Sequence, residues 1–223
     1  EFRRVLFRSP SNIQRYFGSD NSRPGRHLMS IVSPIVGPVF YDLLQHGREI
    51  DRAIARRDAS LLTHSTPELE RYFSRPPGER PRQNPFPVTA LFPLLSIAFA
   101  LNLLPFLQTL PWLSTPERVA SFFVPALVMI IFLLTSGVLL ARGYTLGLKG
   151  FLALFLILSA STAAQALRAM LSAGESLWPL AFAALALLCC RLIFNRQGFV
   201  LFAIYCRSQR LALLAGKLRR QRK

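Results

Sequence analysis

The chain has 223 residues, of which 52% are hydrophobic and 18 are phenylalanine, and its mean hydropathy is positive. This composition argues against an ordinary soluble domain and indicates a membrane protein. The formal net charge of +16 would favour nucleic-acid binding in a soluble protein. Basic residues that flank membrane spans explain the charge without such a partner, so we do not expect nucleic acid to bind.

The acidic residues are concentrated in the first part of the chain. All 11 of them except Glu117 and Glu175 precede residue 86, and long apolar stretches with short polar interruptions follow. This distribution predicts a polar arm followed by a membrane domain. Arginine greatly outnumbers lysine, and alanine, leucine and proline are abundant, which is typical of a GC-rich bacterial genome.

The first nine residues, EFRRVLFRS, show no periodic pattern of apolar residues. Their back-translation resembles the end of a common sequencing-library adapter read in frame. We therefore interpret residues 1–9 as adapter sequence that does not belong to the native protein, as for other non-native leaders. A disordered basic leader is the alternative interpretation.

Residues 10–87 are predicted to form a cytoplasmic arm. The apolar stretch Ser30–Leu44 contains two prolines and a glycine and is too short for a span of roughly 20 residues. A charged amphipathic helix is expected at 40–59, and Ser65-Thr66-Pro67-Glu68 combines a cap, a proline and an acid that favour a second helix start. A Pro-rich basic linker at 75–87 then leads to the membrane.

Residues 88–195 contain four apolar stretches that we expect to cross the membrane, at 88–110, 119–141, 148–170 and 177–195. A helix of this length reaches across a hydrocarbon core of about 30 Å. Short connections make sequential helices antiparallel neighbours. The predicted fold class is an all-α integral membrane protein, a four-helix transmembrane bundle with an N-terminal cytoplasmic arm and a basic C-terminal amphipathic tail.

The charges of the connections predict the orientation. Arg142 and Lys149 flank the second connection without any acid, whereas the first and third connections contain Glu117 and Glu175. From Arg191 onward the chain carries arginines and lysines and no acid. Because cytoplasmic loops are enriched in basic residues, we expect a multi-pass protein of the bacterial inner membrane with both termini in the cytoplasm.

Residues 196–223 are predicted to form the basic tail. Its apolar run, Phe199–Cys206, is too short for a fifth span. The tail could turn at Gly198 and lie along the inner membrane surface, or it could continue the fourth helix; both geometries stay open. Its basic residues are the candidate contacts for anionic lipid: Arg207, Arg210, Lys217, Arg219, Arg220, Arg222 and Lys223.

Polar residues inside the spans form a second set of candidates. Asn102 lies in the first span, and Ser161, Gln165 and Arg168 recur on one face of the third span. They could line a polar pathway, or they could join helices by hydrogen bonds, and we favour packing. The cores of the spans hold no Asp or Glu, which argues against a proton relay.

Motifs that would indicate catalysis are missing from the sequence. His27, His46 and His64 lack the spacing of metal ligands, and the chain has no phosphate-binding loop, serine elbow or metalloprotease motif. We therefore predict no catalytic residue, no cofactor and no metal. The expected function is a non-enzymatic accessory or assembly component that contacts anionic lipid, a membrane protein or a second copy. A small transporter or channel subunit is the alternative.

Overall fold

The computed structural model describes residues 32–56, 65, 67–74, 84–108, 110, 112, 114–171 and 177–221. The expected adapter segment and most of the Pro-rich linker lie outside these residues. Within them every regular element is a helix and no strand occurs, so the all-α prediction is confirmed. The helices are α4 (Val32–Val36), α5 (Pro38–Arg56), α7 (Pro67–Ser74), α8 (Phe86–Thr89), α9 (Leu91–Gln108), α10 (Thr115–Ala141), α11 (Thr145–Leu171), α12 (Trp178–Asn195) and α13 (Gln197–Gln221).

Several of these helices are long and apolar enough to cross a membrane, which confirms a multi-pass membrane protein. Five stretches of the described chain meet this criterion: Phe86–Leu107, Thr115–Ala141, Thr145–Leu171, Trp178–Asn195 and Gln197–Arg219. The first four overlap the spans expected from the sequence. The fifth lies in the predicted tail, and it differs from the others because 56% of it is buried inside the protein.

The chain divides into two compact units. Unit 2 takes Pro85–Val138 and Leu146–Arg196, and therefore contains the four expected spans except the last three residues of the second, 139–141. Unit 1 takes Glu1–Asn84, Leu139–Thr145 and Gln197–Lys223. It thus gathers three segments that are far apart in sequence, namely the arm, the connection between α10 and α11, and the tail helix α13.

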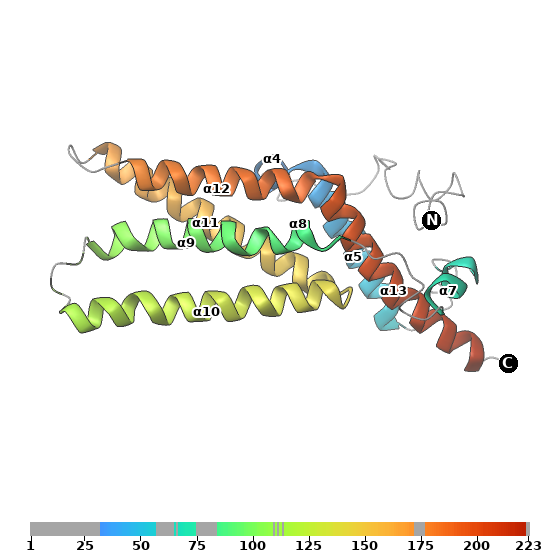
Figure 1. The fold of residues 1–223 in the computed structure, drawn as a ribbon. Helices are drawn as coiled ribbons and strands as arrows, with labels where there is room; N and C mark the ends of the chain where they lie inside the picture. The colour runs from blue at the N-terminus through green and yellow to red at the C-terminus, as the bar shows by residue number, and fades with distance from the viewer. Residues whose placement is uncertain are drawn as a thin grey trace. The chain divides into compact units, whose positions relative to one another are not determined.

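Unit 2 contains the long helices α9, α10, α11 and α12, which run back and forth (Figure 1). Each helix buries one narrow stripe with spacings of three and four residues, the pattern of knobs-into-holes packing. The ring of Phe155 on α11 lies 5.7 Å from that of Phe194 on α12, and Phe92 on α9 lies 6.1 Å from Phe151 on α11. The buried stripes include Leu91, Leu95, Ala98 and Asn102; Met129, Leu133 and Ser136; Leu148, Phe151, Phe155, Leu158 and Thr162; and Leu180, Ala183, Leu187, Cys190 and Phe194.

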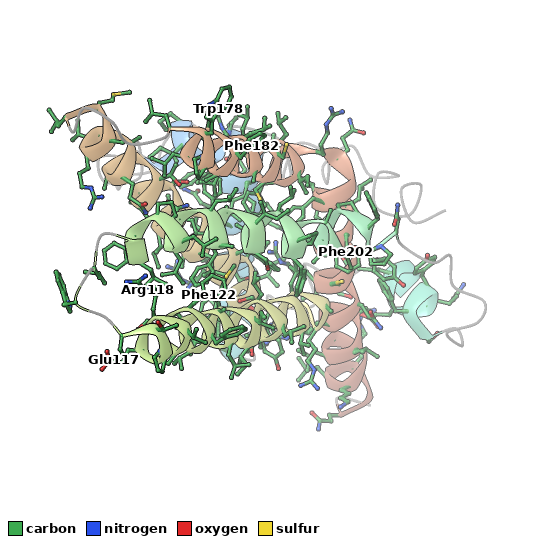
Figure 2. All side chains as sticks on the ribbon, turned by 60° about the vertical axis from the view of Figure 1, so that its left-hand side comes forward. Glu117, Arg118, Phe122, Trp178, Phe182 and Phe202 are labelled. Carbon is green, nitrogen blue, oxygen red and sulfur yellow. The ribbon has the colours of Figure 1, made fainter. Side chains whose placement is uncertain are left out.

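The outward faces of the long helices in unit 2 are apolar. Trp178 and Phe182 stand away from α12, and their side chains are 74% and 57% exposed (Figure 2). Outward apolar side chains also cover α10, for example Phe123 and Leu127. Glu117 and Arg118 mark the polar beginning of α10 in Figure 2, where Glu117 Oε2 accepts from both the backbone N–H and the hydroxyl of Ser114. An exposed apolar surface of this kind suits contact with lipid.

In unit 1, α5 lies along α13 and runs parallel to it (Figure 1). Near the start of the pair the rings of Phe40 and Phe199 are 6.0 Å apart. Further along, Ile50 and Leu211 form a buried cluster that continues through Ile54, Leu214 and Leu218. Both helices bury residues at spacings of three and four, so the contact resembles a short parallel coiled coil.

The helix α7 contacts α13 as well. The ring of Phe73 lies 5.3 Å from that of Tyr205, and the ring of Tyr72 packs edge-on against Phe73. Phe73 and Tyr72 are both buried, although the sequence around them is short and charged. The arm therefore supplies apolar side chains from two of its helices, α5 and α7, and these side chains bury part of the surface of α13.

The connection between α10 and α11 is a tight turn at Gly143. Its φ of 76° is in the left-handed region, which glycine adopts without strain. The N–H of Gly143 donates to Leu140 O and that of Tyr144 donates to Leu139 O, each at 2.9 Å, which is the Schellman pattern that closes a helix C-terminus. A Cβ on Gly143 would lie 2.5 Å from Cys206 O, so this turn packs directly against the backbone of α13.

A single residue separates α12 from α13. Arg196 has an extended backbone, with φ of −77° and ψ of 142°, and its N–H donates to Ile193 O at 3.1 Å. The predicted end of the fourth span at Asn195 coincides with the end of α12. The chain does break there, at Arg196, two residues before Gly198, and then continues as a separate helix of 25 residues.

Candidate functional site

The polar residues of the first and third spans meet inside unit 2. Asn102 on α9 is 3% exposed. Its Nδ2 donates to Ala98 O at 2.7 Å and to Thr162 Oγ1 at 2.9 Å. Gln165 Nε2 donates to Asn102 Oδ1 at 3.2 Å and to Ser161 Oγ at 3.1 Å. The structure therefore brings three of the four predicted intramembrane residues together: Asn102, Ser161 and Gln165.

Thr162 is the member of this cluster that the sequence analysis missed. Its Oγ1 lies 2.8 Å from Leu158 O and 3.1 Å from Asn102 Oδ1, and its single proton can be donated to one of them. Helical periodicity selected Ser161 and Gln165, and Thr162 lies about 100° away from Ser161 on the same helix. Arg168, the fourth candidate, is exposed and is not part of the cluster in the described contacts.

The cluster consists of neutral amides and hydroxyls. Both polar side-chain atoms of Asn102 have partners, and the bonds to Thr162 and Gln165 join α9 to α11. Such an arrangement holds helices together, since a buried polar group in hydrocarbon is stabilised by hydrogen bonds across the interface. It contains no group that titrates near neutral pH, so it offers no means of moving a proton.

Arg207 is the most deeply buried of the predicted lipid contacts whose side chains the structure describes. It is 4% exposed, and its Nη1 and Nη2 both lie 3.3 Å from Leu43 O on α5. Leu43 is itself buried, so the guanidinium reaches the backbone of α5 inside the packed pair of helices. The sequence predicts Arg207 at the surface, facing lipid phosphates, whereas the structure places it in the interior of unit 1.

Arg210, one turn further, is held by three groups. Its Nη1 donates to Asp51 Oδ1 at 2.7 Å and lies 3.4 Å from Gly143 O. The guanidinium carbon lies 3.8 Å from the centre of the Tyr144 ring, which is a cation–π contact. Arg210 therefore joins α13 to both α5 and the turn after α10.

Asp51 uses its second oxygen on the same turn. The N–H of Thr145, the first residue of α11, donates to Asp51 Oδ2 at 3.2 Å. The N-terminus of a helix carries a partial positive charge and unpaired N–H groups, so a carboxylate is favourable there. A single carboxylate from the arm thus binds the start of α11 with one oxygen and α13 with the other. We call Asp51, Arg210, Tyr144 and Thr145 the Asp51 junction.

A second ion pair joins α13 to the other arm helix. Arg219 Nε lies 3.2 Å from Glu70 Oε1, and Arg219 Nη2 donates to Ser65 O at 3.2 Å. The Ser65 hydroxyl donates to the same Glu70 oxygen at 3.1 Å, and Ser65 is buried. Arg219 is therefore also bound within unit 1.

The other basic candidates of the tail are placed differently. Lys217 is exposed on α13. The side chain of Arg220 and the whole of Arg222 and Lys223 lie outside the described residues. Asp51, Glu70 and Tyr144 were missed by the sequence analysis, which interpreted α5 as a solvated helix. The signal for them was the separation of charge, with acids gathered in the arm and bases in the tail.

The described residues contain no group of three or more His, Cys, Asp or Glu side chains that could hold a metal ion. His27 and His64 lie outside those residues. Comparisons with protein-family models, with curated proteins and with solved structures found no match.

Proposed function

We propose that the protein is a non-enzymatic accessory or assembly component of a bacterial inner membrane. In this proposal α9, α10, α11 and α12 anchor it, and unit 1 lies in the cytoplasm, where it contacts anionic lipid or a protein partner. The observation that carries the proposal is unit 1 itself. A packed body built from the arm, the α10–α11 connection and α13 offers a surface for binding, and the described residues contain no group of His, Cys, Asp or Glu side chains that could hold a metal ion.

The contacts of α13 support four spans rather than five. Along its length α13 contacts Phe40, Leu43 and Asp51 of α5 and Glu70 of α7. If α13 crossed the bilayer, these charged helices and the α10–α11 turn would have to enter the hydrocarbon with it. Charged side chains inside a bilayer are costly, so this arrangement is disfavoured.

The membership of unit 1 supports the proposed sidedness. The arm precedes α9, the turn follows α10, and α13 follows α12. Four spans put all three segments on one side of the membrane, as their packing together requires. Arg142, Lys149 and Arg196 are exposed near the ends of these spans, which favours the cytoplasmic side for that end.

Labelling of introduced cysteines in intact cells tests this topology. In a background without the native cysteines, we expect Ser114→Cys and Leu177→Cys to react with an impermeant maleimide from outside. Tyr144→Cys and Lys217→Cys should react only after the cells are opened. External labelling of Lys217→Cys would contradict the four-span model and with it the cytoplasmic position of unit 1.

In-cell crosslinking tests the accessory role. Photoreactive residues at the exposed positions Gln45, Arg52 and Lys217 of unit 1 should yield a defined crosslinked protein or lipid species. The same probe at Phe123, on the outer face of α10, is the control that reports general membrane neighbours. Identical products at all four positions would contradict a specific role for unit 1.

A small transporter or channel subunit is the second candidate, and the buried polar cluster at Asn102 is the observation that favours it. Its closed hydrogen bonds support packing instead. Substrate-dependent flux in proteoliposomes that is abolished by Asn102→Ala and Gln165→Ala, with the protein still folded, would favour transport. Loss of stability without any measurable flux would favour the accessory role.

A further inference from the structure

The helix α13 carries basic residues and no acid, so its counter-charges come from other elements. Two of its arginines have carboxylate partners in the arm. Arg210 Nη1 lies 2.7 Å from Asp51 Oδ1, and Arg219 Nε lies 3.2 Å from Glu70 Oε1. The two carboxylates come from different helices, α5 and α7. Both arm helices are therefore tied to α13 by charge as well as by apolar packing.

The two arginines point to opposite sides of α13. They are separated by nine positions in sequence, which is about two and a half helical turns and rotates one side chain roughly 180° from the other. Asp51 and Glu70 thus hold α13 from two faces. An arrangement of this kind retains α13 only while both arm helices stay in place.

The two ion pairs are more accessible to solvent than Arg207, which lies nearer to the start of α13. The side chains of Arg210 and Asp51 are 19% and 33% exposed, and those of Arg219 and Glu70 are 35% and 15% exposed. Arg207, by contrast, is buried and bonds a backbone carbonyl. Partly exposed ion pairs contribute little net stability and exchange partners readily, whereas a buried guanidinium stays with its acceptor.

A phosphate is the natural competitor for these guanidiniums. It offers several negatively charged oxygens in the geometry that arginine binds best. Only Arg196 separates α13 from the apolar helix α12, so α13 begins beside the headgroup region of any membrane that α12 spans. Phe202, labelled in Figure 2, and Leu213, which is exposed, give α13 apolar side chains of the kind that settle at this interface.

We propose that Asp51 and Glu70 form a carboxylate clasp that withholds Arg210 and Arg219 from the phosphates of anionic phospholipids. Anionic lipid and the clasp compete for the same guanidiniums, and Arg207 keeps α13 on α5 while they exchange. This inference depends on the proposed function, because it names anionic lipid as the partner of unit 1. It adds that the arm inhibits this contact.

Native mass spectrometry of the full chain in detergent tests the competition, with phosphatidylglycerol and phosphatidylcholine as the two probes. The variant Asp51→Asn with Glu70→Gln opens the clasp and raises the net charge by two. Asp42→Asn with Glu49→Gln is the matched control, since it removes two acids from the exposed face of α5 and raises the charge equally. We expect the clasp variant to bind phosphatidylglycerol several-fold more tightly than the control and wild type, with phosphatidylcholine binding unchanged.

Two further variants distinguish release of the Arg210 and Arg219 side chains from general unfolding of unit 1. Adding Arg210→Gln and Arg219→Gln to the clasp variant should abolish its gain. In a cysteine-free background, Ile54→Cys and Leu218→Cys, at positions packed against the same cluster, can be joined by a short bifunctional maleimide. Joining them should leave the gain of the clasp variant in place, because α13 stays on α5 in the proposal, whereas a gain that came from general unfolding of unit 1 would be lost.

The outcomes distinguish this inference from the proposed function. If the clasp variant and its charge-matched control bind phosphatidylglycerol equally, and both prefer it to phosphatidylcholine, the clasp is wrong and the lipid partner stands. A gain that survives the removal of both arginines also overturns the clasp. If no variant prefers phosphatidylglycerol, the lipid partner in the proposed function is itself wrong.

Discussion

Gly47 on α5 lies directly against the guanidinium of Arg207 on α13. A Cβ at Gly47 would collide with Arg207 Nη2 and would lie 2.6 Å from Thr145 Oγ1. Glycine in the middle of a helix is destabilising by about 1 kcal/mol relative to alanine. Its presence in α5 is explained by the space that Arg207 and the start of α11 occupy, and the same close approach lets Arg207 reach Leu43 O.

The first prediction follows from this contact. Gly47→Ala raises the helix propensity of α5, but its methyl group overlaps the side chains of Arg207 and Thr145. Overpacking of this kind typically costs about 1–3 kcal/mol, so we expect a net loss of stability in unit 1. Gly216→Ala on α13 is the matched control, because nothing lies within 4 Å of its new Cβ. Urea-dependent proteolysis of the reconstituted protein measures both. Stabilisation by Gly47→Ala equal to that by Gly216→Ala would contradict the close packing.

The basic residues of α13 should differ in their effect on stability. Arg207→Ala removes a buried side chain and its bonds to Leu43 O, and we expect a loss of about 2–3 kcal/mol. Arg210→Ala breaks a partly exposed ion pair and should cost about 1 kcal/mol, whereas exposed Lys217→Ala should change stability by less than about 0.5 kcal/mol. Urea-dependent proteolysis of unit 1 ranks the three variants. Equal losses of stability for all three variants would contradict the burial of Arg207 in the packed interior of unit 1.

Much of the membrane domain could be predicted from the sequence, because hydropathy depends on local composition alone. The helix α12 ends at the expected residue, and α10 and α11 begin a few residues before the expected spans. The differences between the expected and observed bounds arise at the polar N-terminal ends of α10 and α11. Thr115, Pro116 and Glu117 begin α10 with favourable helix-start chemistry, although they are too polar to be counted in an apolar window.

The packing of unit 1 could not be predicted in the same way. Arg207 was expected at a membrane surface because a basic residue in an apolar run usually reaches for solvent or headgroups. Its burial depends on a glycine 160 positions earlier in the chain, Gly47, and on the turn at Gly143. No local sequence pattern predicts that these distant segments contact one another. The charge separation between arm and tail was the available signal, and it did not identify which carboxylate meets which arginine.

The third prediction concerns the intramembrane cluster. Thr162→Val keeps the shape of the side chain and removes the hydroxyl that bonds Asn102. A hydrogen bond between membrane helices contributes about 0.6 kcal/mol on average and up to about 1.7, so a loss in this range is expected. Thr135→Val on α10 is the control, since its exposed hydroxyl bonds only Ile131 O of its own helix among the described contacts. Steric-trapping measurements in bicelles compare the two. Equal effects would mean that the cluster does not join α9 to α11.

The last prediction concerns pH. Desolvation raises the pKa of Asp42, an exposed residue of α5, above its ordinary value of 3.8, because neighbouring protein atoms displace part of the water that stabilises the charged carboxylate. The folded state then holds this proton to a higher pH than the unfolded state does. Above pH 3.8, therefore, the contribution of Asp42 to stability falls as the pH rises, until the carboxyl is ionised in both states.

Asp42→Asn removes this dependence, and other titrating groups cancel when variant and wild type are compared. The free energy of unfolding of the variant minus that of the wild type should be smallest at acidic pH. It should rise through the window above pH 3.8 and then stay constant. Urea titrations at a series of pH values measure this difference. A difference that falls with rising pH would mean that the ionised Asp42 is stabilised in unit 1, and that burial does not control its pKa.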